Sequence, residues 1–285
     1  MVAFIAVVVG FARASLSPRY ASAAEIVQTN SDQVIDQNAA TMLSQGRQTF
    51  RYDSFGDEAF WTDALKLNLA IEGATLGGVG PGVSPKAALA VGLKVDMDKL
   101  PPSIVDAIKA GKVDLDSPAT TLALLQLNAV VGVKASVEGS GGDARLRSIG
   151  ITCALCHSTV DNAFAPGIGH RLDGWPNRDL NVGAIVALAP DLSVVQKLLG
   201  ANRTTVVSVL HSWGPGKFDA ELFMDGKAFR PDGKSAATLI PAAFGLAGVN
   251  LHTYAGWGFG DAVERLCREP RDARQRNVLR SALGG

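Results

Sequence analysis

The stretch Cys153-Ala154-Leu155-Cys156-His157 decides how this sequence is interpreted. It has the C-x-x-C-H form, in which two thiols bond the vinyl groups of a porphyrin as thioethers and the adjacent histidine is held under the iron. Both results follow from the short spacing, because a histidine directly after the second cysteine has few places to go. The motif therefore predicts one covalent c-type haem, with Cys153 and Cys156 as attachment residues and His157 as the proximal iron ligand.

A bare C-x-x-C pair has two other interpretations. One is a dithiol redox pair, which is expected near a βαβ pattern, and the other is half of a zinc site, which needs a second pair of ligands. No βαβ pattern is visible near the motif, and the third cysteine, Cys267, stands alone far downstream. We therefore favour covalent haem, while the dithiol and zinc interpretations stay open.

The composition is that of an ordinary soluble globular protein. The 285 residues suffice for one large domain or two modest ones, and 27 basic residues balance 27 acidic ones. A net charge of zero gives no indication of binding to nucleic acid or to an anionic membrane. We expect no nucleic-acid partner and no stable membrane span.

The N-terminus has the features of a signal peptide. Residues 1–12 form an apolar run too short to span a bilayer, and Ala21-Ser22-Ala23 supplies a small-x-small cleavage signal. Because haem attachment to C-x-x-C-H needs export to an oxidising compartment, the two signals support each other. We expect residues 1–23 to be a signal peptide and the protein to be bacterial and periplasmic. The alternative is a buried N-terminal strand or helix.

Local patterns predict a mainly α fold. Helical apolar spacing or capping signals occur at 39–50, 57–71, 103–110, 117–128, 191–199 and 204–213. Alternating apolar residues on both sides of a Gly-rich turn predict a β-hairpin over 130–152. Residues 160–182 are expected to be a structured loop. We therefore divide the chain into a helical N-terminal region, 24–150, which ends in the hairpin that leads into the motif, and a haem-binding region, 151–258.

From the motif onward the chain resembles the cytochrome c superfamily. In particular, it is similar to a group of bacterial single-haem cytochrome c domain-containing proteins, mostly uncharacterised, that have long N-terminal regions. The stretches that carry the resemblance are GRQTFRYDSFGDEAFW (46–61), ITCALCHSTVDNAFAPGIGHRLDGWPNRDLNVGAI (151–185), SWGPGKFDAEL (212–222) and LIPAAFGLAGVNLHTYAGWG (239–258). The resemblance covers most of the chain and implies a cytochrome c-like haem domain and electron transfer. It implies no particular substrate.

The resemblance also implies roles for single residues. Gly46 and Phe50 look like the glycine and phenylalanine on the first helix of smaller cytochromes c, although a long insertion separates them from the cysteines here. Family members often have a proline soon after the motif whose carbonyl accepts a hydrogen bond from the proximal histidine, and Pro166 is similarly placed. Such a bond fixes the orientation of the ring and raises its basicity as a ligand.

The distal iron ligand is the next question. Cytochromes c use a methionine or a second histidine on the far side of the iron. Met224 lies at a suitable distance after the motif and is the predicted distal ligand. The alternatives are His170, His211 and His252, or a vacant position, which would indicate ligand binding or catalysis.

The last residues, 259–285, differ in composition from the rest. Six arginines and no lysine fall between Arg265 and Arg280. One interpretation is an exposed basic helix, and the other is the product of a frameshift near Phe259. We favour the frameshift, because shifting the back-translated sequence by one base gives a segment with helical apolar spacing and a Met-His pair. The native distal ligand would then be the lost methionine.

Together these features predict a periplasmic electron-transfer cytochrome with one covalent haem and a periplasmic redox partner protein. The alternative is a haem-dependent oxidoreductase, peroxidase-like or acting on a small molecule, with an open sixth coordination position. A third interpretation is a haem-bearing module that docks onto a larger respiratory complex. Trp175, Trp213 and Trp257 would build an enzyme's substrate pocket, but packing at the haem edge and in the core explains them more simply. The sequence therefore fits an electron carrier better than a catalyst.

Overall fold

The structure is a computed structural model that describes residues 30–219 and 237–244. The chain divides into two units, residues 1–44 and residues 45–285. Helix α1 (Asn30–Tyr52) begins in the first unit and ends in the second. Each unit is described by itself.

Within the first unit the described residues are all helical. Residues 30–44 form the beginning of α1, and their side chains are exposed. The predicted signal peptide, 1–23, and the arginine-rich segment, 259–285, lie outside the described residues.

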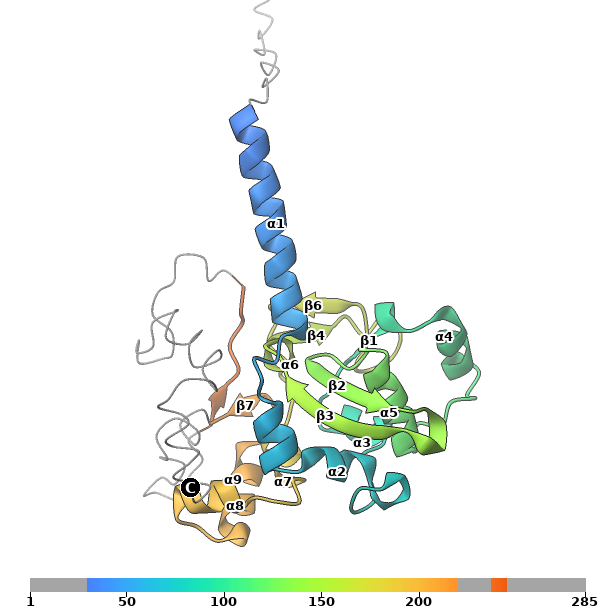
Figure 1. Ribbon diagram of the computed structural model, residues 1–285, viewed down its shortest axis with the longest axis vertical. Helices are drawn as coiled ribbons and strands as arrows, with labels where there is room; N and C mark the ends of the chain where they lie inside the picture. The colour runs from blue at the N-terminus through green and yellow to red at the C-terminus, as the bar shows by residue number, and fades with distance from the viewer. Residues whose placement is uncertain (1–29, 220–236, 245–285) are drawn as a thin grey trace, which may run out of the picture. The chain divides into compact units, whose positions relative to one another are not determined.

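The second unit is built from many short elements (Figure 1). After α1, its helices and helical turns are η1 (Ala59–Ala64), α2 (Leu67–Glu72), η2 (Ala74–Leu76), α3 (Pro85–Ala90), η3 (Met97–Lys99), α4 (Pro102–Lys109), α5 (Pro118–Gln126), η4 (Gly141–Asp143), α6 (Ala154–His157), α7 (Val182–Ala187), α8 (Ser193–Leu199) and α9 (Arg203–Trp213). Its strands are β1 (Val95–Asp96), β2 (Val133–Glu138), β3 (Arg145–Ile151), β4 (Ser158–Val160), β5 (Ile168–Gly169), β6 (Arg171–Asp173), β7 (Lys217–Phe218) and β8 (Thr238–Leu239).

The predicted mainly α, cytochrome c-like fold is wrong. The described residues are about 48% helical and 15% strand, a mixed α/β arrangement with small sheets. Those strands pair as β1–β5, β2–β3, β4–β6 and β7–β8. Two local causes explain the difference. The helix expected over 57–71 is interrupted at Lys66, whose φ of 57° is left-handed, and part of the loop expected over 160–182 pairs as strands instead.

The β-hairpin expected over 130–152 is present as strands β2 and β3 (Figure 1). The two strands are antiparallel, with Val133 opposite Ile151 and Glu138 opposite Arg145. The hairpin packs against α5, and β3 also packs against α2. Strand β3 therefore ends two residues before Cys153 and delivers the chain to the motif, as predicted.

Helix α5 also begins where the sequence predicted. Ser117 has an extended backbone and its hydroxyl accepts a hydrogen bond from the Ala119 N–H at 3.3 Å. Pro118 occupies the first helical position, where its missing N–H costs nothing. Leu122 and Leu125 on this helix are buried in the core.

A single large apolar cluster connects the two halves of the second unit. It runs from α2, α5 and β3 to α7 and α9, where Leu210 and Trp213 are almost completely buried. The Trp213 ring meets Phe218 of β7 edge-on, with centroids 5.5 Å apart. Trp213 is therefore a core residue, as the simpler interpretation of the tryptophans predicted.

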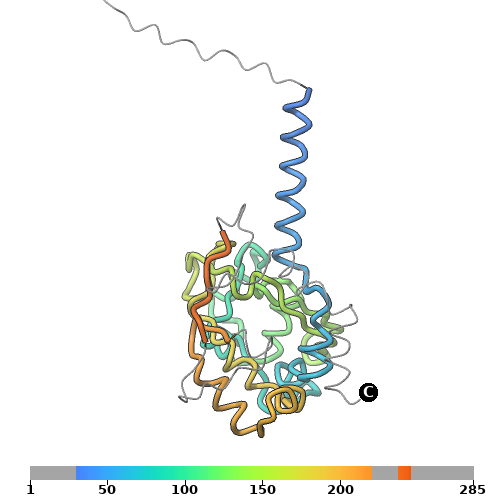
Figure 2. The backbone as a smooth tube through the Cα atoms, turned by 90° about the vertical axis from the view of Figure 1, so that its left-hand side faces the viewer, coloured from blue at the N-terminus to red at the C-terminus, as the bar shows by residue number. Residues whose placement is uncertain are grey.

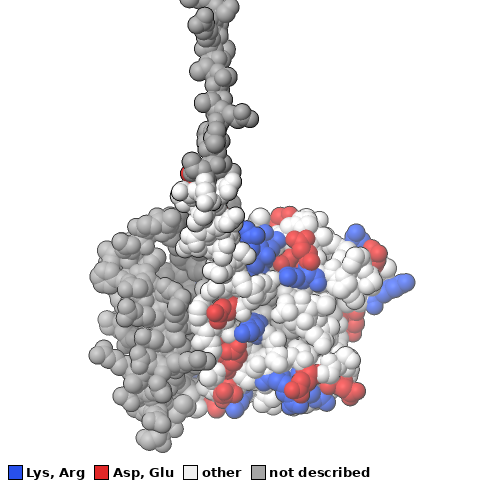
Figure 3. All heavy atoms as spheres, turned by 45° about the horizontal axis from the view of Figure 1, so that its top comes forward, with Lys and Arg blue, Asp and Glu red and all other residues white. Residues whose placement is uncertain are grey.

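The surface carries charges of both signs. On the face shown in Figure 3, basic and acidic side chains are interleaved rather than separated. Some of them form ion pairs, such as Lys86 with Asp116 and Arg147 with Glu138. Over the described ranges, none of the helices combines the length and the apolar character that crossing a bilayer requires.

Candidate haem-attachment site

The C-x-x-C-H motif forms a single helical turn. Helix α6 follows β3 after two linking residues, Thr152 and Cys153, and the His157 N–H donates to the Cys153 carbonyl at 3.1 Å. Residues three apart lie on the same face of a helical turn, so Cys153 and Cys156 share one face. The motif thus presents two thiols and one imidazole from the same turn, which is the arrangement that attaching one planar group at two points requires.

A glycine directly before strand β2 lets this turn pack closely against the hairpin. Gly132 has a φ of 78°, and a Cβ atom there would lie 2.1 Å from the Leu155 backbone nitrogen. Its carbonyl accepts the Thr152 N–H at 3.0 Å. Any side chain at position 132 would therefore push α6 away from the hairpin.

Asn177 supports the motif from the other side. This residue is 1% exposed, and its backbone N–H donates to the Cys156 carbonyl at 2.9 Å. Its side-chain amide donates to the carbonyls of Gly92, at 2.9 Å, and Leu155, at 3.5 Å. One buried asparagine thus satisfies carbonyls at the end of the turn and ties the turn to the loop before β1.

His157 is oriented by a residue far along the chain. Its ring Nδ1 lies 3.0 Å from the Pro241 carbonyl oxygen, 84 positions away in the sequence. A carbonyl can only accept, so this hydrogen bond requires the proton on Nδ1 and leaves the lone pair of a neutral ring on Nε2. Burial lowers the pKa of His157, although the bond to Pro241 opposes this effect. The ring is therefore held in the neutral form, with Nε2 suited to ligate a metal ion.

The predicted acceptor for this histidine was Pro166, whereas in the structure the acceptor is the Pro241 carbonyl. Pro166 and Gly167 form a tight turn, in which Ala165 and Ile168 exchange backbone hydrogen bonds of 2.8 and 3.2 Å. Gly167 has the positive φ, 80°, that the third position of such a turn favours. Pro166 therefore shapes the turn before β5, while Pro241 takes the role that was expected of it.

The state of the cysteines bears on the dithiol and zinc interpretations of the motif. Neither Cys153 nor Cys156 forms a disulfide. Burial, with a smaller contribution from Cys153, raises the pKa of the Cys156 thiol to about 12. In a C-x-x-C redox pair the first cysteine is the nucleophile and the second is the buried one, so this pKa fits the dithiol and the haem interpretations equally. Within 30–219 and 237–244, no group of three or more His, Cys, Asp or Glu side chains is placed to hold a metal ion, so a zinc site would need ligands from elsewhere.

Asp173 joins the strands next to the motif to α1. Arg51 contacts its Oδ2 at 2.6 Å, Arg171 contacts its Oδ1 at 2.7 Å, and the Ser158 hydroxyl donates to Oδ1 at 2.8 Å. Burial alone would raise the pKa of Asp173, but the Arg171 charge and the three hydrogen bonds hold it below its ordinary value. One carboxylate therefore pairs with two guanidinium groups and links the β4 and β6 strands that follow the motif.

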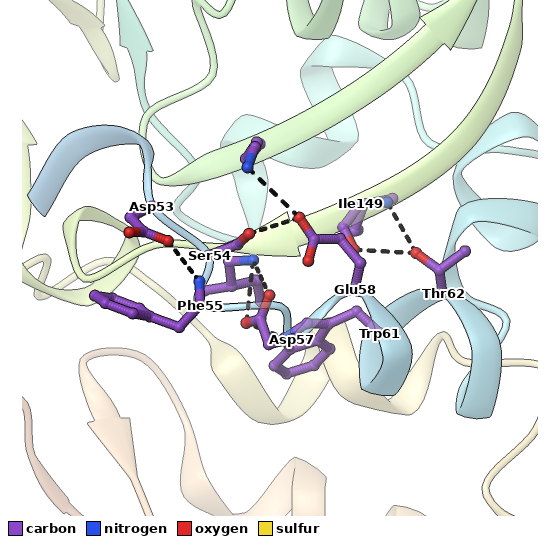
Figure 4. Close-up of polar contacts among 10 residues, drawn as sticks. Asp53, Ser54, Phe55, Asp57, Glu58, Trp61, Thr62 and Ile149 are labelled. Carbon is purple, nitrogen blue, oxygen red and sulfur yellow. Dashed lines mark hydrogen bonds and ion pairs between the residues drawn. The ribbon is translucent and has the colours of Figure 1, made fainter. Parts of the chain in front are cut away.

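The turn before η1 braces the strand that leads into the motif (Figure 4). Asp57 accepts the Ile151 N–H with both oxygens, at 3.1 and 3.2 Å, and the Trp61 indole N–H at 2.8 Å. Glu58 accepts the Ser54 hydroxyl at 2.5 Å. Burial raises the pKa of Asp57 to about 6, against the effect of its hydrogen bonds. The Asp57 carboxyl group, with its pKa raised to about 6, is thus hydrogen-bonded to the end of strand β3, just before Cys153.

The segment 237–244 lies beside the residues that follow β6 (Figure 2). Gly174 connects them, because its carbonyl accepts the Ala243 N–H at 2.8 Å and a Cβ there would lie 3.1 Å from the Phe244 ring, while its own N–H donates to the His157 carbonyl at 2.8 Å. The rings of Trp175 and Phe244 pack at a tilt, with centroids 5.3 Å apart, and both side chains are about half exposed. An aromatic pair therefore borders the motif on the side of His157.

The resemblance pointed to Phe50, and the structure places this residue against the motif. Phe50 packs with Val131, Ala154 and Val160 in a small cluster separate from the main core. Gly46, one turn earlier on α1, is exposed. The end of α1 therefore contacts the helical turn that carries the cysteines.

The distal ligand stays a prediction. Met224 and His252 lie outside the described residues. His170 is exposed, and its Nδ1 contacts the Asp98 carboxylate at 2.8 Å. His211 lies exposed on α9.

Sequence reasoning missed two residues that position the motif, Pro241 and Asn177. Pro241 had a weak signal, since it interrupts an apolar stretch where a helix would otherwise continue. Asn177 follows Trp175 and Pro176, and nothing in that context marks its side chain as buried.

Comparison of the chain with protein-family models, with curated proteins and with solved structures found no match.

Proposed function

We propose that this chain is an exported bacterial c-type haem protein that transfers electrons through one haem bound to Cys153 and Cys156. His157 is the proximal iron ligand in this proposal. A bound haem supplies the one-electron chemistry, while the protein sets its potential, access and partner. The acceptor or donor is a redox partner protein in the periplasm.

The observation that carries the proposal is the state of His157. The ring lies on the same helical turn as the two cysteines, and its Nδ1 is bonded to the Pro241 carbonyl at 3.0 Å. Proximal histidines that donate their outer N–H to a carbonyl are better electron donors through the other nitrogen. This arrangement supports haem ligation over a dithiol, which has no need of an oriented imidazole.

Other residues of the chain support the same chemistry. Ala154 and Leu155, between the cysteines, are buried, so the inner face of the turn is closed to water. Asn177 holds the Cys156 carbonyl, which limits movement of the second attachment point. The turn is therefore prepared as a rigid support rather than a mobile loop.

The first test is retention of haem after denaturation. The protein is expressed with its N-terminal segment in a bacterium that has c-type haem maturation machinery, then unfolded in denaturant and examined by visible absorption and mass spectrometry. We expect a mass increase of one haem that survives denaturation. Substitution of both motif cysteines, Cys153→Ala with Cys156→Ala, should abolish it, whereas Cys267→Ala is the matched control and should retain it.

The same sample distinguishes the two haem functions. A low-spin spectrum indicates that a sixth ligand comes from this chain, which supports electron transfer. A high-spin spectrum that changes when carbon monoxide or cyanide is added indicates an open position and favours the oxidoreductase alternative. Absence of covalent haem in the exported protein overturns both and returns the cysteines to dithiol or metal chemistry.

A further inference from the structure

A cavity lies in the core directly behind the haem-attachment motif. It has a volume of about 70 Å³ and is lined by residues of α2, α3, α5, α7 and the first three strands, together with Leu155 of α6. Leu155 is the residue between the two motif cysteines, and it is buried. The cavity therefore shares one wall residue with the motif.

The walls of this cavity are apolar. They are formed by aliphatic side chains such as Leu89, Leu125 and Ile185. Only two wall residues in the described chain, Lys94 and Thr121, carry a polar side-chain atom, and both atoms are engaged elsewhere. The Thr121 hydroxyl donates to the Val83 carbonyl at 2.6 Å, and the Lys94 ammonium is paired with Asp179.

These walls select the chemistry of an occupant. A cavity that offers no polar partner does not hold water stably, because a buried water needs two to four hydrogen bonds. A cavity of about 150 Å³ lined by aliphatic and aromatic side chains is known to stay dry and to bind benzene or xenon. The present cavity has roughly half that volume, so it fits the smaller of those two occupants.

We infer that this cavity is a binding site for a small apolar molecule of the size of xenon or dioxygen. The inference concerns the folded chain and does not depend on the haem. Because Leu155 separates the cysteines, an occupant of the cavity lies against the inner face of the attachment turn. Binding would therefore change the packing of Leu155 inside the motif, without any polar contact.

Xenon is the probe for the test. Methyl resonances of the folded protein are followed by NMR at increasing xenon pressure, with the same pressures of helium as the reference. We expect saturable shifts at the methyl groups of Leu155, Leu125 and Ile185, and much smaller, linear shifts at apolar groups elsewhere. Oxygen under pressure, which is paramagnetic, should selectively broaden the same resonances if dioxygen itself enters.

Two alanines of α3 provide a matched pair of variants. Ala88 is buried and lines the cavity, whereas Ala90 on the same helix is exposed. Ala88→Leu should fill the cavity and abolish the saturable shifts, and Ala90→Leu should leave them unchanged. If Ala88→Leu does not fold, Val130→Ile fills the cavity from another wall and should weaken xenon binding at least several-fold.

Two results would overturn the inference. One is a wild-type protein whose wall methyl groups show only linear shifts, which means that xenon does not bind there. The other is an unchanged saturable response in a folded Ala88→Leu or Val130→Ile protein, which places the binding outside this cavity. Neither result bears on the haem proposal, because the readout is the methyl groups and not the haem spectrum.

Discussion

The His157 ring and the Pro241 carbonyl are joined by a hydrogen bond of 3.0 Å that spans 84 positions of the sequence. This bond connects the attachment turn to the segment 237–244. It also determines which ring nitrogen carries the proton, since a carbonyl cannot donate. The tautomer of His157 is thus fixed by a backbone carbonyl, which no side-chain substitution removes directly.

The first prediction concerns the tautomer of His157 in the haem-free protein. We expect long-range ¹H–¹⁵N NMR to show the proton on Nδ1, and a pH titration to give a pKa below the ordinary value of 6.5. A lowered histidine pKa means that this group's contribution to stability is present above pH 6.5 and is lost as the pH falls through the folded pKa. A His157→Gln variant should lack that loss. A proton on Nε2, or an unshifted pKa, would contradict the assigned bond.

The second prediction concerns Asp57. The folded protein keeps this carboxyl protonated up to a pKa of about 6, whereas the unfolded chain releases the proton near 3.8. Its contribution to stability is therefore complete below the unfolded value and is lost as the pH rises toward 6. Between those two values, the free energy of unfolding of the wild type should fall by about 1 to 2 kcal/mol relative to Asp57→Asn, allowing for partial exposure. Urea unfolding at several pH values measures this difference, and parallel curves would refute it.

The third prediction concerns the reactivity of Cys156. Its thiol is held protonated by burial, with a pKa of about 12. In a haem-free protein whose other two cysteines are serine, iodoacetamide at pH 8 should alkylate native Cys156 roughly 50-fold more slowly than the urea-unfolded chain. This estimate combines the smaller thiolate fraction with the greater nucleophilicity of a more basic thiolate. Mass spectrometry gives both rates. Equal rates would show that the thiol is accessible and ionised in the folded protein.

The fourth prediction concerns Asp173. Its carboxylate neutralises Arg171, whose side chain is only 4% exposed, and it also binds Arg51. Asp173→Asn leaves a buried cation without its counter-charge and should lower the free energy of unfolding by about 3 kcal/mol. The control is Asp116→Asn, which breaks an exposed pair with Lys86 and should cost about 0.5 kcal/mol or less. Chemical denaturation of both variants compares them directly, and similar losses would mean that the Asp173 network is not specific.

Several elements of the fold could be predicted from local sequence. Alternating apolar residues before a Gly-rich turn predicted the hairpin, and the pairing shifts register once, between Ser136 and Val137. Ser117 followed by Pro118 predicted the start of α5, since both residues act within one turn. These features depend on neighbours a few positions apart, which is the range that sequence patterns report.

The rest depends on contacts between distant residues. Strand β4 is three residues long and has no periodicity of its own, and its pairing with β6 depends on Asp173 bonding Ser158 and Arg51. Lys66 ends a helix in the left-handed region without any glycine to mark the place. Of the candidate site, the three motif residues were predicted from their spacing, whereas Pro241 was not, because its carbonyl is supplied by the fold and not by a type of side chain.

The attachment turn is held by partners from both far upstream and far downstream. The Thr152 hydroxyl donates to the Arg51 carbonyl across 101 positions, and His157 reaches Pro241 across 84. Contacts with such separations close long loops, and the entropy of closing those loops is lost before the contacts stabilise anything. In the proposed haem protein, a group attached at this turn is therefore linked to residues on both sides of it in the sequence, Arg51 and Pro241.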